Sequence, residues 1–261
     1  MKDRIKFSWL LLLLCLACNE KKTVLETEVI TLNSTDQIVL VVDSLVRPVL
    51  YHNVPVLDGY TVEKSKELFI AIVLPAILIA KHHLTIERQK IERLSEKKHW
   101  SAEDSTYYQL QASRFKAKNV AGLLNRMTTH PNSIALAQAA VESGWGSSRF
   151  FREANNLFGI WAYNADEPRI AADGNNVYLR KYDDLSQSIE DYFVTLGRAR
   201  PYRKFRAAKL ETDDIYQLLP YLRHYSARGH DYITQLKTII KQNNLTQYDN
   251  FRIDPRYFVE K

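Results

Sequence analysis

The order of apolar and polar residues along the chain predicts a mainly helical protein. From Val62 to about Lys98 the spacing is that of one long helix. Its first half holds thirteen uninterrupted apolar residues, Leu68–Ala80, and we expect Pro75 to kink or interrupt it. Because thirteen residues fall short of the roughly twenty that a membrane-spanning helix requires, we expect this stretch to be buried inside the domain.

Further helices follow the long one. Ser101, with Asp104 three places later, resembles a capping box and predicts a helix through about Ala117. A short helix is expected over Val120–Met127. The stretch Ser133–Ser143 is apolar almost all round, which indicates a central buried helix.

Two parts of the chain have β character. From Ile38 to Val56 the content of β-branched residues is high, so we expect short strands or extended structure there. Residues 157–183 contain the turn signal Gly174-Asn175-Asn176 between two short apolar and aromatic runs, which predicts a β-hairpin lobe. Helical patterns resume at Asp184 and continue to the end of the chain. The expected fold class is mainly α (α+β), with a small β insert.

The N-terminus has the features of an export signal. Basic residues precede an apolar core that ends at Leu16, and the small residue Ala17 stands before Cys18. Leu16-Ala17-Cys18 resembles the lipobox of bacterial lipoproteins, although Cys15 stands where that box usually has leucine. We therefore expect a lipoprotein signal peptide over residues 1–18, with lipidation at Cys18. The alternative is a plain signal peptide with a chance cysteine.

Composition narrows the possible functions. The chain has 36 Lys and Arg against 30 Asp and Glu, and removal of the signal segment leaves an excess of only about four positive charges. That excess is too small and too dispersed to indicate nucleic-acid binding. Both cysteines, Cys15 and Cys18, lie in the signal segment, so we expect no disulfide and no catalytic thiol in the folded part. The seven histidines have no ligand-like spacing, and we expect neither a metal site nor a cofactor.

One short stretch has the composition of a catalytic site. Three of the eight glycines crowd into residues 144–159, and Glu142 is the only acid in the apolar helix that precedes them. Burial and the negative end of that helix should both raise the pKa of Glu142. A carboxyl that stays protonated is what a glycosidase needs to protonate a leaving sugar oxygen. The alternative is a structural Glu142 that is paired with Arg149 or Arg152.

A family resemblance supports the catalytic interpretation. The segment Ala135–Tyr163, ALAQAAVESGWGSSRFFREANNLFGIWAY, resembles the signature of the bacterial glucosaminidase domains of glycoside hydrolase family 73. Tyr225–Tyr232, YSARGHDY, resembles loosely a second segment of that family, and the upstream helix resembles its Bax-related branch. The similarity covers roughly residues 62–244. It implies a lysozyme-like helical domain over residues 61–261 with a long N-terminal helical extension, after a linker and short extended segment over residues 19–60.

The same resemblance implies roles for individual residues. Glu142 matches the catalytic acid, and Tyr225 matches a tyrosine that lines the active site. The family carries a second carboxylate in the β lobe, where Asp166, Glu167 and Asp173 are available and Glu167 is favoured because it is the only glutamate. An absent second acid is also compatible with help from the acetamido group of the substrate.

Aromatic side chains near these positions offer apolar faces for sugar rings. The candidates for substrate binding are Trp145, Trp161, Tyr163 and Tyr232, of which Trp161 is the best placed for stacking. Phe158 is expected to belong to the core.

Together these features predict a peptidoglycan hydrolase of the cell envelope. We expect a membrane-anchored lipoprotein that faces the periplasm, acts on glycan strands and cleaves the β-1,4 bond after N-acetylglucosamine. Two alternatives stay open. One is a lytic transglycosylase, which uses a single Glu and closes a 1,6-anhydro ring. The other is an inactive glycan-binding lipoprotein.

Overall fold

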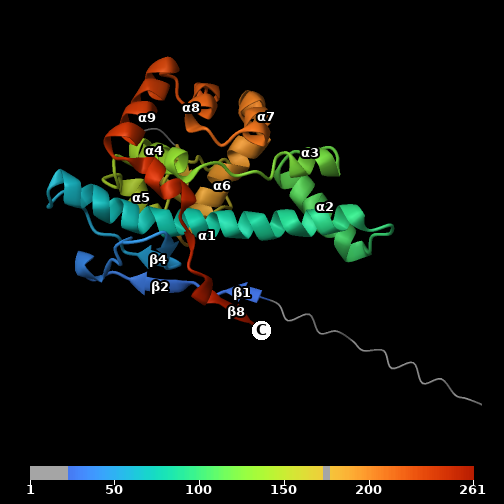
Figure 1. The fold of residues 1–261 in the computed structure, drawn as a ribbon, viewed down its shortest axis with the longest axis horizontal. Helices are drawn as coiled ribbons and strands as arrows, with labels where there is room; N and C mark the ends of the chain where they lie inside the picture. Colours follow the sequence, from blue (N-terminus) through green and yellow to red (C-terminus); the bar gives the residue numbers. More distant parts are fainter. Residues whose placement is uncertain (1–22, 173–176) are drawn as a thin grey trace, which may run out of the picture.

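A computed structural model of the chain describes residues 23–172 and 177–261. The predicted signal segment with Cys18, and the predicted turn with Asp173, lie outside these residues. The described part is mainly helical, as the sequence predicted (Figure 1). Its helices are α1 (Val62–Glu96), α2 (Ala102–Arg114), α3 (Val120–Leu124), α4 (Asn132–Ser143), α5 (Arg149–Ala154), α6 (Leu185–Arg198), α7 (Arg203–Glu211), α8 (Ile215–Leu218) and α9 (His230–Gln242).

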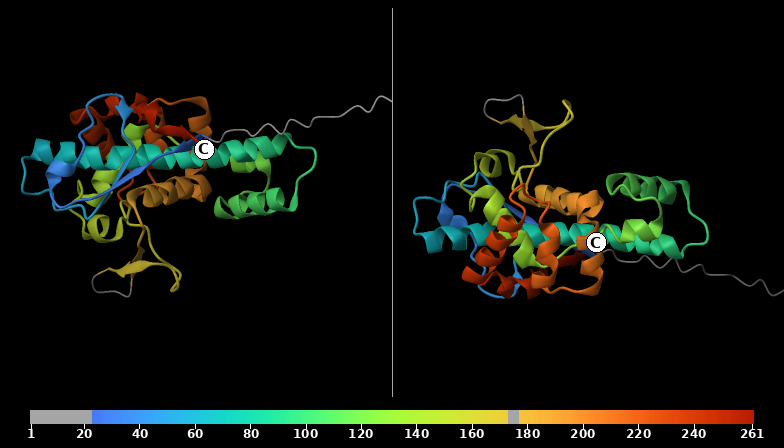
Figure 2. Two further views of the ribbon diagram at one scale, coloured as in Figure 1. Left: turned by 90° about the horizontal axis from the view of Figure 1, so that it is seen from below. Right: turned by 90° about the horizontal axis from the view of Figure 1, so that it is seen from above.

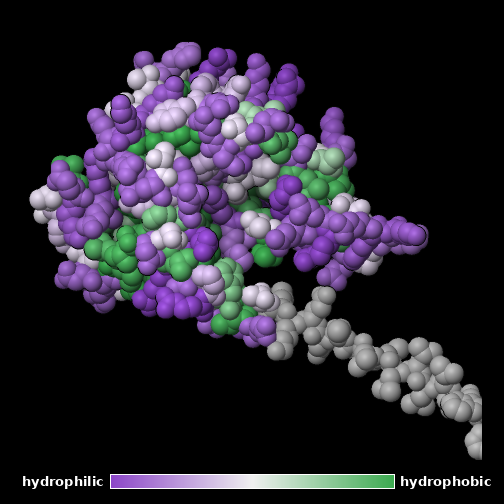
Figure 3. Space-filling model, in the orientation of Figure 1, coloured by the Kyte–Doolittle hydropathy of each residue, from purple (hydrophilic) through white to green (hydrophobic). Residues whose placement is uncertain are grey.

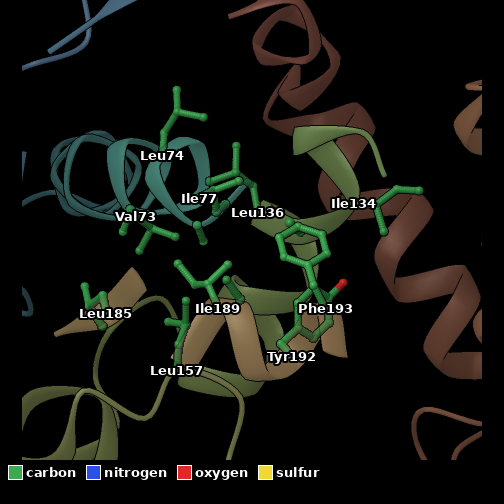
Figure 4. Close-up of a cluster of buried hydrophobic side chains, with 14 of the residues drawn as sticks. Val73, Leu74, Ile77, Ile134, Leu136, Leu157, Leu185, Ile189, Tyr192 and Phe193 are labelled. Atoms are coloured by element: carbon green, nitrogen blue, oxygen red, sulfur yellow. The ribbon is translucent and has the colours of Figure 1, made fainter. Parts of the chain in front are cut away.

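Helix α1 is the axis around which the other elements pack. It begins after Thr61, whose side chain accepts a hydrogen bond from the amide of Lys64. We expected Pro75 to kink or interrupt the helix, but the helix continues through this residue to Glu96. Every residue of Leu68–Ala80 is buried. The apolar face of α1 packs against α4 and α6 (Figure 4), where Val73 and Ile77 lie close to Ile189 and Leu136.

The burial of α1 shows whether the apolar stretch Leu68–Ala80 belongs to a membrane or to the protein core. By length and composition alone the helix is able to cross a membrane, but 72% of its most apolar window is covered by the rest of the protein. The second half of α1 is polar, and the end of the molecule that it forms is mostly hydrophilic (Figure 3). The prediction that Leu68–Ala80 belongs to the core is confirmed.

The capping prediction for the next helix is also confirmed. The Ser101 hydroxyl accepts a hydrogen bond from the Asp104 amide at 3.0 Å, and the Asp104 carboxylate accepts one from the Ser101 amide at 3.2 Å. Helix α2 then ends at Arg114. Helix α4 is buried over nearly its whole length, as its uniform apolar composition indicated.

Short strands connect the two ends of the chain. They are β1 (Thr23–Leu25), β2 (Glu28–Thr31), β3 (Leu45–Val46), β4 (Val49–His52), β7 (Arg252–Ile253) and β8 (Phe258–Glu260). Strand β1 pairs antiparallel with β8, whereas β2 pairs parallel with β4 and β3 parallel with β7. Within the segment 19–60, for which the sequence analysis expected a linker and short extended structure, residues 23–25 and 28–31 are therefore paired strands. Their partners lie up to 237 residues away, at Glu260, which a local pattern does not reveal.

A β lobe, residues 157–183, projects from the helical body (Figure 2). Its strands β5 (Arg169–Ala171) and β6 (Tyr178–Arg180) pair antiparallel, and a bridge between Trp161 and Leu179 extends the pairing. The predicted hairpin is confirmed. Asn156 fixes the base of the β lobe, because its side-chain amide donates to the carbonyls of Ile160 and Arg180 at 2.9 Å each.

Candidate active site

The site is built at the end of helix α4, where the backbone makes an unusual turn. Gly144, Trp145 and Gly146 all have positive φ, of 58°, 56° and 87°. A Cβ on Gly144 would lie 2.7 Å from the Ser147 hydroxyl, and one on Gly146 would lie 3.2 Å from the ring of Phe151. The two glycines are therefore required by the turn that ends α4 and leaves Glu142 on the last helical turn.

Glu142 lies in a cleft of about 550 Å³ between the helical body and the β lobe. The cleft walls come from α4, the β lobe, the end of α6 and the segments that follow α6 and α8. The lining residues are Glu142, Phe158, Ile160, Trp161, Tyr163, Arg180, Thr195, Arg198, Ala199, Tyr202 and Tyr225. Within residues 23–172 and 177–261, Glu142 is the only acidic residue that lines this cleft.

The environment of Glu142 favours the protonated acid. The side chain reaches solvent, but the walls of the cleft surround the carboxyl group and raise its pKa by desolvation. Two groups oppose this shift. The Tyr232 hydroxyl donates a hydrogen bond to Oε1 of Glu142 at 2.9 Å, and the positive charge of Arg228 also lowers the pKa. The pKa of Glu142 is therefore raised, in the direction that the sequence predicted, although the side chain is exposed at the cleft.

Tyr225 lines the cleft beside Glu142, as the family resemblance implied. Its ring stacks on Tyr232, with centroids 5.8 Å apart and planes 9° from parallel. Tyr192 and Tyr202 also contact it, at 6.1 and 6.3 Å between ring centroids. Burial raises the pKa of Tyr225 well above its ordinary value, so the phenol is a neutral hydrogen-bond donor.

Two aromatic side chains of the β lobe form an exposed surface at the mouth of the cleft. Trp161 is 52% exposed and Tyr163 is 85% exposed, and their ring centroids lie 6.2 Å apart. Adjacent exposed aromatic rings at the mouth of a cleft are a candidate binding surface. The predicted binding residues Trp161 and Tyr163 are thus brought to the same cleft as Glu142.

The predicted second acid is engaged elsewhere. The carboxylate of Glu167 forms an ion pair with Arg180, at 2.9 Å from Nε, and accepts a hydrogen bond from the Asn164 amide at 3.1 Å. Arg180 also pairs with Asp191 at 2.5 Å, so that the guanidinium, and not Glu167, lines the cleft. Asp166 lies in the turn beside Glu167, where its amide bonds to Asn164.

Two of the predicted binding residues have other contacts. Trp145 packs edge-on against Phe69 of α1, with centroids 5.4 Å apart, and Lys66 lies 5.0 Å above its ring. Trp145 is therefore not among the residues that line the cleft with Glu142, and its role in substrate binding stays a prediction. Tyr232 is fully buried and contacts Glu142, so it has no surface for a sugar ring. Phe158 is buried, as expected, and stacks on Tyr192 at 4.0 Å.

Several residues of the site were not found from the sequence. Tyr202, Thr195 and Arg198 line the cleft from the end of α6 and the turn after it, and Tyr192 lies behind them. Gln138 could have been found from the sequence, because a polar residue at the centre of an apolar helix indicates a buried hydrogen-bonding role. The structure shows that Gln138 is fully buried. In the described parts of the chain, no group of three or more His, Cys, Asp or Glu residues has the placement of a metal site.

Comparison with known proteins identifies relatives of the region that holds the cleft. Residues 117–245 match the model of the glucosaminidase family, described as mannosyl-glycoprotein endo-β-N-acetylglucosaminidase. The protein Bax of Escherichia coli K12 is 26% identical over 192 residues, which is 68% of this chain and 69% of Bax. The exo-glucosaminidase LytG of Bacillus subtilis 168 is 28% identical over 128 residues, 45% of each chain. The solved catalytic domain of the autolysin Auto from Listeria monocytogenes is 25% identical and covers 62% of this chain and 97% of that domain, with a TM-score of 0.39.

Proposed function

Because this chain belongs to the glucosaminidase family through residues 117–245, we propose that it is a peptidoglycan hydrolase. The proposed activity is that of an endo-β-N-acetylglucosaminidase, which hydrolyses the β-1,4 bond after N-acetylglucosamine in glycan strands. One observation carries the proposal. Glu142, a carboxyl with a raised pKa, lies in a cleft whose mouth presents exposed aromatic rings.

Glu142 is proposed as the general acid. Its protonated carboxyl would transfer the proton to the glycosidic oxygen as the bond to the anomeric carbon breaks. The carboxylate left behind would keep the hydrogen bond that the Tyr232 hydroxyl donates. Tyr225, a neutral phenol that lines the same cleft, is proposed to position the sugar next to this acid.

The β lobe is proposed to bind the glycan strand. Sugar rings present C–H faces that stack on aromatic side chains, and Trp161 and Tyr163 offer two adjacent faces for such contacts. LytG is named an exo-glucosaminidase, which supports an amino-sugar polymer as the class of substrate. Arg180 and Arg198 line the cleft as well, and their charges suit a polymer with carboxylate groups.

The group that stabilises the positively charged sugar is proposed to come from the substrate. Glu167 would have to leave Arg180 before it reached a sugar in the cleft. The acetamido oxygen of N-acetylglucosamine is able to do this work instead, because it lies next to the anomeric carbon of the same sugar. A water molecule would then complete the hydrolysis. Glu167 remains the lobe residue to test against this proposal.

A second candidate activity follows from the same arrangement. A lytic transglycosylase also needs a single acid, and Glu142 is the one acidic residue that lines the cleft among residues 23–172 and 177–261. The two activities differ in what attacks the sugar: water in hydrolysis, and an internal hydroxyl in transglycosylation. Only hydrolysis leaves a reducing N-acetylglucosamine end.

The location of the protein is proposed to be the cell envelope, on the periplasmic side of a membrane. Residues 1–18 would act as a lipoprotein signal, and acylation of Cys18 would anchor the chain. Strand β1 begins at Thr23, five residues after Cys18. Such a short connection would hold the domain close to the membrane surface. In this proposal residues 19–60 lie between the anchor and a catalytic region over residues 61–261 in the sequence, and strand β1 of this segment pairs with β8 at the other end of the chain.

Product analysis tests the proposed function. The protein lacking residues 1–18 is incubated with purified peptidoglycan sacculi, and the released fragments are identified by mass spectrometry. Reducing N-acetylglucosamine ends support the glucosaminidase, and 1,6-anhydro ends identify a transglycosylase. Binding without release, unchanged in Glu142→Gln, would identify the inactive glycan-binding protein instead.

A further inference from the structure

A buried chain of polar side chains extends from Glu142 into the core. The Tyr232 hydroxyl donates to Oε1 of Glu142 at 2.9 Å, and it accepts a hydrogen bond from Nε2 of Gln138 at 2.9 Å. Oε1 of Gln138 accepts from the Tyr192 hydroxyl at 2.6 Å. The Tyr192 oxygen lies 2.8 Å from Nε2 of His130, which closes the inner end.

The residues of this chain are almost completely inaccessible to water. Gln138 and Tyr232 are 0% exposed, Tyr192 is 1% exposed and His130 is 2% exposed. A buried polar group that lacks a partner costs about 1–3 kcal/mol, so an apolar core does not tolerate such groups without a reason. Figure 4 shows that Tyr192 stands among the apolar side chains of the cluster around α6. Neighbouring side chains of this network satisfy one another, and Nδ1 of His130 lies 3.1 Å from the carbonyl oxygen of Pro131.

The three assigned donors all point in one direction, toward Glu142. Tyr192 donates to Gln138, Gln138 donates to Tyr232, and Tyr232 donates to the carboxyl. Aligned hydrogen bonds polarise one another, so the inner bonds make the Tyr232 hydroxyl a stronger donor. The inner end is neutral, because burial and the charge of Lys81 lower the pKa of His130 to about 3.

We propose that Tyr232, Gln138 and Tyr192 are positioning residues for the general acid. They form one hydrogen-bond chain that fixes the Glu142 carboxyl in the cleft and stabilises the carboxylate left after it gives up its proton. This inference rests on the proposed function only for its effect on catalysis. The effect of the hydrogen-bond chain on the pKa of Glu142 can be measured in the protein without substrate.

The hydrogen-bond chain offsets part of the upward shift in the pKa of Glu142. Desolvation alone would make Glu142 a weak acid that holds its proton too tightly. A donor hydrogen bond to the charged form offsets part of that effect. The titratable or charged groups that face Glu142 come from α6, the turn after it, the segment before α9 and α9 itself. They are Tyr192, Tyr202, Tyr225, Arg228 and Tyr232. Burial raises the pKa of each tyrosine, so Arg228 is the charged member of this set.

The first measurement is a titration of the Glu142 carboxyl carbon by NMR in the substrate-free protein. Tyr232→Phe keeps the ring that stacks on Tyr225 and removes the donor. It should move the titration midpoint upward by about one pH unit. Gln138→Met and Tyr192→Phe should move it in the same direction by smaller amounts. Gln138→Met should add no further shift in the Tyr232→Phe background, because Gln138 acts through Tyr232.

Tyr51→Phe is the matched control. Tyr51 is also a buried tyrosine, 1% exposed, but its hydroxyl accepts from the Val39 amide on the other side of α1, away from the cleft. It should leave the Glu142 midpoint unchanged even where the melting temperature falls as far as in Tyr232→Phe. If Gln138→Met does not fold, Tyr192→Phe tests the inner part of the chain. Unchanged midpoints in Tyr232→Phe and Tyr192→Phe, or an equal shift in Tyr51→Phe, would overturn the inference.

Kinetics on sacculi give the catalytic consequence. The chain variants should lower kcat and leave KM nearly unchanged, and the alkaline limb of their pH profiles should move upward with the NMR midpoint. If the wild-type protein does not cleave sacculi but the variants shift the Glu142 midpoint, the proposed function is refuted and the role of the hydrogen-bond chain stands. If the wild-type protein is active but the variants do not shift the midpoint, only the role of the hydrogen-bond chain is refuted.

Discussion

The carboxylate of Glu167 lies 2.9 Å from Nε of Arg180, and this ion pair takes the predicted second acid out of the lining of the cleft. Arg180 is at the same time bound by Asp191 of α6. Arg180 therefore connects the β lobe to the helical body through Asp191, whereas the pair with Glu167 lies within the lobe. This contact favours a structural role for Glu167 inside the lobe over a direct role in the reaction.

Substitution of Glu167 tests this distinction. Glu167→Gln keeps the size of the side chain and weakens the ion pair, so we expect kcat on sacculi to change by only a few fold. Removal of a partly exposed ion pair should cost about 0–1 kcal/mol of stability. Glu153→Gln, at an exposed site paired with Arg149, is the matched control. A loss of two or more orders of magnitude in kcat would restore Glu167 as a catalytic acid.

Glu142→Gln should have the opposite effect on activity. The amide keeps the shape of the side chain but has no proton to transfer, so turnover should fall by about 10²- to 10⁴-fold or more. The melting temperature should scarcely fall at neutral pH, because the amide removes an ionisable group whose charged form is disfavoured by burial. Both quantities are measured on one preparation. A destabilised but active variant would identify Glu142 as a structural residue.

The pH profile should follow the protonation of the same residue. Because burial raises the pKa of Glu142 above that of a free glutamate, the acid stays protonated to higher pH. We expect kcat to fall as pH rises through that pKa. The free energy of unfolding should also fall as pH rises. Because the native state binds the proton of Glu142 more tightly than the unfolded state, this residue stabilises the fold at low pH, and its contribution is lost as pH rises through the native pKa. A kcat that is independent of pH on the alkaline side would argue against a carboxylic general acid.

The exposed aromatic pair should affect substrate binding more than chemistry. Trp161→Ala and Tyr163→Ala each remove one stacking face, and we expect KM on sacculi to rise several fold, while Trp161→Phe should retain most of the binding. Because these side chains are exposed, stability should change little. Tyr216→Ala, at another exposed tyrosine (51%) outside the cleft, is the control and should leave KM unchanged.

Cys18→Ser tests the anchor. If Cys18 is acylated, the native protein should partition into detergent and the variant should not, and the variant should accumulate as an uncleaved or soluble form. Unchanged partitioning would refute lipidation. It would also direct attention back to Leu68–Ala80, although that stretch is buried in the fold.

The sequence by itself determined the features that depend on neighbouring residues. The helix over 62–96, the capping box of Ser101 and Asp104, the buried α4 and the glycines of the turn after Glu142 are all local, because hydrogen bonds within a helix or turn join residues a few places apart. For the same reason the hairpin of the β lobe was predictable. The family resemblance added the roles of Glu142 and Tyr225, which remain proposals.

Only the tertiary structure decided which distant residues meet. Tyr232 is 90 residues from Glu142 in sequence, and β1 pairs with β8 at the other end of the chain. Trp145 and Trp161 lie only 16 residues apart in the sequence, but the first packs on α1 and the second reaches the cleft. Such outcomes depend on how whole elements pack, because the burial of one apolar face fixes where all the polar side chains of that element point. No local pattern contains that information.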